Sequence, residues 1–405
     1  MVKDSEALGA SLHGSGCEEE RDMDRKIKHG RGMAQIRLLV EVAAIVGCIA
    51  FIIRVSNRLE SAGESMGVSF LFMALLFVGM YVAFFLQILI HEAGHLIFGL
   101  LTGYQFRSFD IGGFTWVKEG EKIRFQRTAL FEAMGQCQMY PPQIRDGRSS
   151  CLPYHLGGVL LNLVSAAVFA VGALGLKEHL VLSAWLAIIA VFGALSAFSN
   201  GIPVPGGLVH NDGYNAACLW KNQEALDAYY IQGQLSRQQA EGIRMKEMPG
   251  EWFEMPKQEA LKNGTIAVTA VLACARLIDQ MRFKEAGQTI ERLLSMETGI
   301  TGMHRGLLTV ELIYCELVGE NRQDRLEALL DEKQEKFMAH MRKKLPVLRT
   351  EYAYELLAGK DEAEAKRFRE QFESAAAEYP YLGELAGERE RMDYARKIAK
   401  IEQGG

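Results

Sequence analysis

Four long apolar segments constrain the fold of this chain more than any other feature. They lie at 38–53, 68–90, 155–176 and 180–198, and only the first of them, which contains Glu41, carries an Asp, Glu, Lys or Arg. About 20 apolar residues cross the hydrocarbon core of a bilayer as a helix, and lipid offers no partner for unpaired backbone groups. We therefore predict a polytopic membrane protein with four transmembrane helices. The segment 38–53 is the weakest candidate, because it is short and contains Glu41.

The remaining residues divide the chain into four parts. Residues 1–37 are polar and are expected to be disordered, 38–220 form the membrane domain, 221–261 form a connector, and 262–405 are rich in charged, helix-forming residues. The formal net charge is -5, and no basic patch with interleaved aromatic residues occurs, so we expect no nucleic-acid partner. Seven cysteines without a CxxC pair indicate neither a disulfide framework nor a thiolate zinc site.

Basic residues predict the orientation in the membrane. Lys and Arg gather before the first span and in the 103–150 loop. In contrast, the loop at 54–67 contains only Arg54 and Arg58, and the loop at 177–179 contains only Lys177. Since Lys and Arg are enriched in cytoplasmic loops, both termini and the 103–150 loop are expected in the cytoplasm. The pattern suits a bacterial inner membrane. Translation could also start at Met33, which would leave this orientation unchanged.

The stretch LQILIHEAGHLIFG at 86–99 places ionisable groups inside an apolar run. On a helix, His91 and His95 lie about 40° apart, so both imidazoles can reach one point. Glu92 lies about 100° from His91, where it can contact a metal-bound water without ligating the metal. This HExxH pattern is typical of a Zn²⁺ site. The alternatives are chance core residues or polar groups that line a transport path.

A zinc site of this kind needs a third protein ligand, and the segment 199–217 offers two candidates. Prolines and glycines interrupt the helix there, and unpaired backbone at membrane depth is tolerated only inside a protein-lined cavity. Asp212 is followed by the flexible Gly213, which allows its carboxylate to turn inward. His210 competes with it on chemistry alone. We favour Asp212, because a carboxylate also makes the buried site less positive.

Three segments together resemble the site-2 protease family of intramembrane zinc metalloproteases. HEAGH at 91–95 matches the HExxH of that family at the end of an apolar span, and LGGVLLN at 156–162 is similar to its AGPxxN stretch, with Val159 where proline is usual. NGIPVPGGLVHNDG at 200–213 resembles its N-x-x-P…DG segment, although the gap between Asn200 and Asp212 is longer. The similarity covers about residues 68–220.

The resemblance implies a complete catalytic site. Its zinc ligands, one ion per chain, would be His91, His95 and Asp212, with Glu92 as general base and Asn162 lining the site. The implied activity is hydrolysis of a peptide bond in or near a transmembrane segment of a membrane-anchored protein substrate. Two other functions stay open: an inactive membrane scaffold or adaptor that acts through its C-terminal helices, and a zincin of another class with Glu132 as third ligand.

Two further regions have recognisable patterns. Residues 104–127 alternate apolar and polar side chains around Gly112–Gly113 and Glu119–Gly120, which predicts one or two short β-hairpins. They form either a solvated connector or an edge strand that pairs with an unwound substrate segment. From 262 onward, helical hairpins with turns near Met281, Gly319 and Gly359 indicate degenerate tetratricopeptide-type repeats or a plain helical bundle. Such a soluble domain could bind a regulatory protein.

Overall fold

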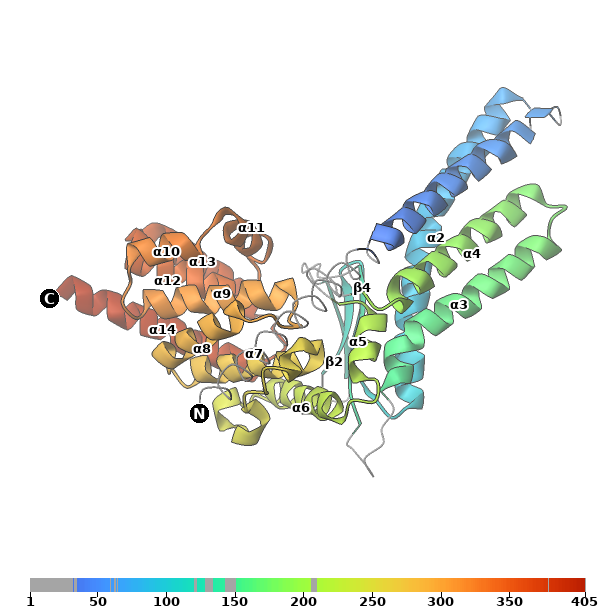
Figure 1. The fold of residues 1–405 in the computed structure, drawn as a ribbon. Helices are drawn as coiled ribbons and strands as arrows, with labels where there is room; N and C mark the ends of the chain where they lie inside the picture. The colour runs from blue at the N-terminus through green and yellow to red at the C-terminus, as the bar shows by residue number, and fades with distance from the viewer. Residues whose placement is uncertain are drawn as a thin grey trace, which may run out of the picture. The chain divides into compact units, whose positions relative to one another are not determined.

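The computed structural model is mainly helical, with one small antiparallel sheet (Figure 1). It describes residues 32, 35–58, 60, 61, 63, 65–119, 122–127, 134–142, 151–204, 210–377 and 379–404. Most of the predicted polar segment 1–37 therefore lies outside the described residues. The chain divides into two compact units. One falls within Met1–Phe98, Tyr154–Pro205 and Asn211–Tyr214, and the other within Gly99–Pro153, Gly206–His210 and Asn215–Gly405.

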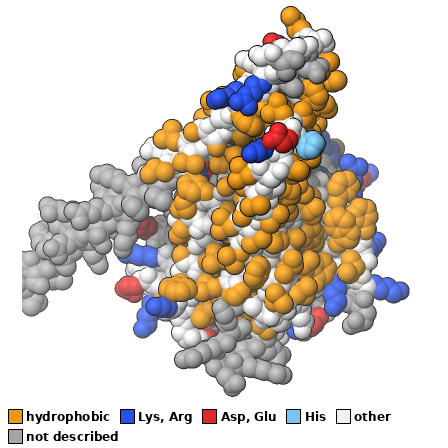
Figure 2. Space-filling model, turned by 90° about the vertical axis from the view of Figure 1, so that its right-hand side faces the viewer, with side chains coloured by type: hydrophobic (Ala, Val, Ile, Leu, Met, Phe, Trp, Pro, Cys, Tyr) orange, Lys and Arg blue, Asp and Glu red, His pale blue; other side chains and the backbone are white. Residues whose placement is uncertain are grey.

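The first unit contains four helices that are long and apolar enough to cross a membrane. They are Gln35–Arg58, α2 (Met66–Leu101), α3 (Leu152–Gly175) and α4 (Leu180–Gly201). This confirms the four predicted apolar segments as helices of spanning length. Hydrophobic side chains cover most of the face that Figure 2 shows. Such a surface suits lipid rather than water, because large contiguous apolar patches are rare on soluble monomers.

Contacts between these helices bury both large and small apolar side chains. Ile52 of the first helix, Leu76 and Ala83 of α2, and Ala184 and Ile188 of α4 form one buried cluster. Lipid tails are as apolar as leucine, so close packing rather than the hydrophobic effect holds such helices together. We therefore expect the helices of this unit to be held together mainly by complementary van der Waals packing.

The sheet belongs to the second unit and has the strand order β3-β2-β1-β4. Its strands are β1 (Gln105–Ile111), β2 (Phe114–Glu119), β3 (Lys122–Arg127) and β4 (Gly135–Tyr140). Glycines at 112 and 113, both with positive φ, make the turn between β1 and β2, so the predicted hairpins are present. The sequence did not predict β4, which pairs antiparallel with β1 around a β-bulge. Its sequence, GQCQMY, gives only a weak signal because the alternation of glutamines with Cys137 and Met139 extends over so few residues.

Helices make up the rest of the second unit. In chain order they are α5 (Asp212–Leu219), whose residues 212–214 belong to the first unit, α6 (Gln223–Ala240), α7 (Gly264–Asp279), α8 (Phe283–Ser295), α9 (Gly302–Leu317), α10 (Gln323–Leu329), α11 (Glu332–His340), α12 (Leu345–Tyr354), α13 (Glu362–Ala376) and α14 (Leu382–Gly404). Short 3-10 helices at Met245–Glu247, Gly250–Phe253 and Ala260–Lys262 join α6 to α7, and a π-helical turn at Glu355–Gly359 extends α12. The residues expected as a connector, 221–261, thus contain α6.

Three helical hairpins are present where the sequence predicts them. The turns α7–α8, α9–α10 and α12–α13 contain Met281, Asn321 and Lys360, each with positive φ. The paired helices are unequal, since α10 has 7 residues and α9 has 16. The tetratricopeptide-type repeat therefore stays a prediction, whereas a helical C-terminal region is confirmed.

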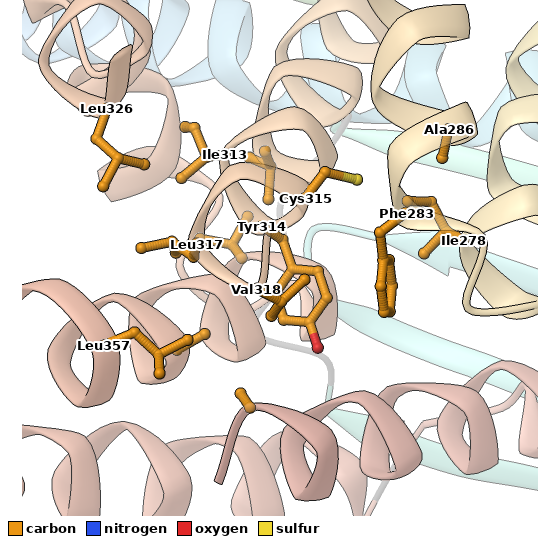
Figure 3. Close-up of a cluster of buried hydrophobic side chains, with 14 of the residues drawn as sticks. Ile278, Phe283, Ala286, Ile313, Tyr314, Cys315, Leu317, Val318, Leu326 and Leu357 are labelled. Carbon is orange, nitrogen blue, oxygen red and sulfur yellow. The ribbon is translucent and has the colours of Figure 1, made fainter. Parts of the chain in front are cut away.

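The core of this unit is a cluster of buried hydrophobic side chains around α9 (Figure 3). Tyr314 and Ile313 are almost fully buried, and Phe283 packs against the Tyr314 ring with centroids 5.5 Å apart. A buried ion-pair network lies beside it: Arg349 is 0% exposed and contacts Glu311 at 2.6 Å and Glu388 at 2.9 Å. Buried charges persist only when they are paired, so this network fixes how α9, α12 and α14 pack.

We expect the C-terminal helices to fold without the membrane part. A fragment of residues 221–405 should be soluble and helical by circular dichroism, because α6 buries Leu235 in one cluster with Met248, Phe253 and Ala273. A fragment of residues 262–405 should be less stable, because it lacks α6 and the residues that pack on α7. If both fragments gave random-coil spectra, the helices would depend on the membrane domain.

Candidate metal centre

Two histidines of α2 and one aspartate of α5 converge at one point in the first unit. His91 and His95 are each 7% exposed, and their Nε2 atoms lie 3.2 Å apart. The Asp212 Oδ2 atom lies 2.9 Å from the Nε2 of His91 and 3.4 Å from that of His95. Among the described residues, these three form the one group of His, Cys, Asp or Glu side chains that could hold a metal ion.

The hydrogen bonds behind the two imidazoles fix their tautomers. His91 Nδ1 lies 2.7 Å from Asn162 Oδ1, and His95 Nδ1 lies 2.7 Å from the Tyr154 carbonyl oxygen. Both oxygens only accept hydrogen bonds, so in the neutral imidazoles each Nδ1 carries the proton. Each Nε2 then presents a lone pair to the centre. Metal-ligating histidines typically show this arrangement, with the second nitrogen held by an oxygen acceptor.

The centre therefore brings three electron-pair donors together. Burial alone would raise the pKa of the Asp212 carboxyl, but hydrogen bonds from the two imidazoles, and their positive charge when protonated, lower it more, so the pKa lies below its usual range. Facing lone pairs and a carboxylate repel one another unless a cation or proton lies between them. For tetrahedral Zn²⁺ with bonds of about 2.0–2.1 Å, neighbouring donors lie roughly 3.3 Å apart. The three observed separations are close to this value.

Asn162 is completely buried in α3 and links the centre to its surroundings. Its amide nitrogen donates to the backbone oxygen of Gln87 at 3.0 Å and to the side-chain oxygen Oε1 of the same residue at 2.7 Å. Its Oδ1 also accepts a hydrogen bond from the Ser196 hydroxyl at 3.1 Å. Sequence reasoning named Asn162 but missed Gln87 and Ser196. An amide four residues before His91, on the same face of an apolar helix, was the signal for Gln87.

Glycines allow the helices around the centre to approach closely. A Cβ on Gly94 would lie less than 3.0 Å from the backbone of Gly157, and the converse also holds, so α2 and α3 touch through their backbones. A Cβ on Gly158 would lie 2.5 to 2.7 Å from three atoms of the His91 ring. The small size of Gly94 thus allows α3 to approach α2 beside the two histidines.

The start of α5 positions Asp212. Asn211 donates from Nδ2 to the carbonyl oxygens of Ser199 at 2.9 Å and Ile202 at 2.7 Å, and its Oδ1 accepts from the Tyr214 N–H at 3.0 Å. A Cβ on Gly213 would collide with the backbone of Gly201. Asn211 therefore caps α5 and ties it to the end of α4, because its side chain bonds to both.

The other predicted residues lie as follows. Glu92 is 7% exposed and lies on α2 beside His91, about 100° around the helix axis. His210 lies elsewhere, with its Nε2 2.9 Å from the Gly299 carbonyl oxygen in the second unit. Val159, which replaces the proline of the family motif, is buried in α3. Glu132 lies outside the described residues.

Comparisons with known proteins identify no relative. The chain matches no family model, no curated protein and no solved structure.

Substituting Gly158 should weaken metal binding. In Gly158→Ala the new methyl group would push the His91 ring out of place, and overpacking of this kind typically costs about 1–3 kcal/mol, or roughly 5- to 150-fold in affinity. Zinc titration of the purified protein with a competing chelator measures the change. Gly175→Ala, in the same helix with no atom within 4 Å of its Cβ, is the matched control and should bind zinc normally.

Proposed function

We propose that this protein is an intramembrane zinc endopeptidase. The observation that carries the proposal is the convergence of His91 Nε2, His95 Nε2 and Asp212 Oδ2 next to helices of spanning length. Two imidazoles and one carboxylate leave a fourth coordination position open, which is typical of catalytic rather than structural zinc sites. The sequence resemblance to site-2 proteases points to the same activity. The site would hold one Zn²⁺ per chain.

The residues around the centre would share the work of peptide hydrolysis. Zinc, when bound, polarises both the attacking water and the carbonyl of the scissile bond. Glu92 takes a proton from that water and delivers it to the leaving amine. Asn162 keeps the proton of His91 on Nδ1, so that Nε2 remains a ligand. The burial of Glu92 strengthens each of these electrostatic interactions, because little water screens them.

The proposed substrate is a membrane-anchored protein whose helix unwinds before cleavage. Helical carbonyls are already hydrogen-bonded, so an extended segment must be presented to Glu92 and the metal. Among the described strands, β3 and β4 are the two edges of the sheet, which supports the proposal that β3, in the predicted hairpin region, accepts an extended segment as an added strand. The C-terminal helices, whether tetratricopeptide-type repeats or a plain bundle, would bind a regulatory protein.

Two alternatives can be separated from this function. An inactive scaffold or adaptor would not need Nε2 lone pairs and a carboxylate at one point. A zincin with Glu132 as third ligand would leave Asp212 without a role at the metal, although its carboxylate lies 2.9 Å from His91. The geometry therefore favours the site-2-protease-like assignment.

A comparison of membrane proteomes tests the proposed function. Cells with the intact protein should contain membrane-protein fragments that are absent when Glu92→Gln replaces it, while the uncut proteins accumulate in the variant. Identical fragment patterns, with both proteins present at equal amounts in the membrane, would contradict the protease assignment.

We also propose that the protein lies in a bacterial inner membrane with both termini in the cytoplasm. The basic residues of the 103–150 loop support this orientation. A cysteine at position 366, where the lysine side chain is 78% exposed, provides a label site on α13. In intact cells, Lys366→Cys should resist a membrane-impermeant thiol reagent and should react with it after lysis. Rapid labelling before lysis would reverse the topology.

A further inference from the structure

Gln87 is a buried polar side chain of α2 that the proposed chemistry leaves unexplained. It is 2% exposed and lies inside a helix of spanning length. Polar groups at that depth are expensive and usually have a specific role. Its side chain is fully oriented, since Nε2 donates to the Ile189 carbonyl oxygen of α4 at 3.1 Å, and Oε1 accepts from Asn162 and from Ser165 of α3.

These hydrogen bonds form a chain between the metal centre and α4, in which each group donates to the next one toward α4. The Ile189 carbonyl can only accept, so it fixes the nitrogen of the Gln87 amide. The Gln87 oxygen then accepts from the Asn162 nitrogen, which leaves the Asn162 oxygen facing His91. An oxygen at that position binds the Nδ1 proton. If the Asn162 amide were turned over, its N–H would face Nδ1, and the proton of the neutral ring would move to Nε2.

Packing around Gln87 supports the same role. A Cβ on Gly193 of α4 would lie 3.0 Å from Gln87 Nε2, so glycine at this position leaves room for the amide. Gln87 thereby connects α2, α3 and α4: its Nε2 donates to the Ile189 carbonyl oxygen, and its Oε1 accepts from the Asn162 amide and the Ser165 hydroxyl. A residue that served only to fill space would not need this orientation.

We propose that Gln87 is a positioning residue for the metal: it orients the Asn162 amide and thereby keeps the Nε2 atom of His91 free to ligate. This inference rests on the proposed zinc site. It assigns Gln87 no contact with substrate or metal. Its effect should reach the metal entirely through Asn162, which makes the proposal testable by a double-mutant cycle.

The experiment uses the full-length protein in detergent, with Zn²⁺ affinity measured by chelator competition. Gln87→Met, similar in volume but unable to hydrogen-bond, should bind zinc 10–100-fold more weakly, as is usual when the outer partner of a metal-ligating histidine is lost. Asn162→Ala should lose at least as much, and the double variant should be no worse than Asn162→Ala alone. With Co²⁺ in place of zinc, the visible absorption band of the four-coordinate ion should weaken or shift in Gln87→Met.

The outcomes distinguish a failure of the proposed function from a failure of the inference about Gln87. If the intact protein binds no zinc, the proposed function itself is wrong. If it binds zinc and Gln87→Met does so equally well, or if the two single losses add in the double variant, Gln87 does not act through Asn162 and the inference is overturned.

Gln87→Glu, whose neutral carboxyl can donate and accept like the amide, should restore most of the affinity. Ser69→Ala, another buried polar position of α2, should match the intact protein in zinc affinity and helix content.

Discussion

If the proposed function is correct, Glu92→Gln should slow cleavage strongly and leave zinc binding intact. The amide has the shape of the carboxylate and can still hydrogen-bond, but it cannot take a proton from the attacking water. Loss of a positioned general base typically slows a reaction about 10²- to 10⁴-fold. Zinc content should be unchanged, since His91, His95 and Asp212 are the three converging donors. The measurement pairs metal analysis with cleavage of a reconstituted membrane substrate.

The opposite pattern would be informative. If Glu92→Gln lost zinc as well as activity, Glu92 would take part in binding the metal. If it cleaved at close to the rate of the intact protein, the base would be another residue, or the reaction would not be hydrolysis.

Asp212→Ala should empty the site, and His210→Ala should not. The Asp212 carboxylate faces both imidazoles, whereas the His210 ring reaches the Gly299 carbonyl. Loss of an outer partner of a ligand typically weakens binding by about 10–100-fold, and loss of the ligand itself should exceed that range. Metal analysis of the purified variants should find near one equivalent in His210→Ala and far less in Asp212→Ala.

The reverse outcome would reassign the third ligand to His210. Asn211→Ala provides an intermediate case, because it leaves the carboxylate in place but removes the cap that fixes the start of α5. We expect it to weaken zinc binding without abolishing it.

Much of the fold could be predicted because lipid imposes strict rules. Spanning segments must be long, apolar and helical, so the runs at 38–53, 68–90, 155–176 and 180–198 each indicated one helix. Helical spacing also placed His91 and His95 on one face. Local pattern predicted the β1–β2 turn, because two adjacent glycines separate alternating segments. These features depend on residues that are close together in the sequence.

Features that depend on distant residues were harder to predict. Asp212 and His210 are two residues apart, and the side chains of both can ligate zinc. Which of them faces the two histidines depends on the path of the backbone after α4. Gln87 is a single polar residue in an apolar run. Its role could not be predicted, because its hydrogen-bond partner Asn162 lies 75 residues later in the sequence. Strand β4 was missed for the same reason. It pairs with β1, and β2 and β3 lie between these two strands in the sequence.

The order of the site residues along the chain has a consequence for biosynthesis. His91 and His95 emerge from the ribosome with α2, Asn162 follows with α3, and Asp212 comes last. During insertion the two imidazoles therefore enter the bilayer before their carboxylate partner exists. The backbone contact at Gly94 and Gly157 can join α2 to α3 first, as expected for helices that insert singly and then associate. We expect that tight zinc loading follows release of the 211–214 segment, so that a ribosome-arrested chain ending before residue 212 binds the metal only weakly.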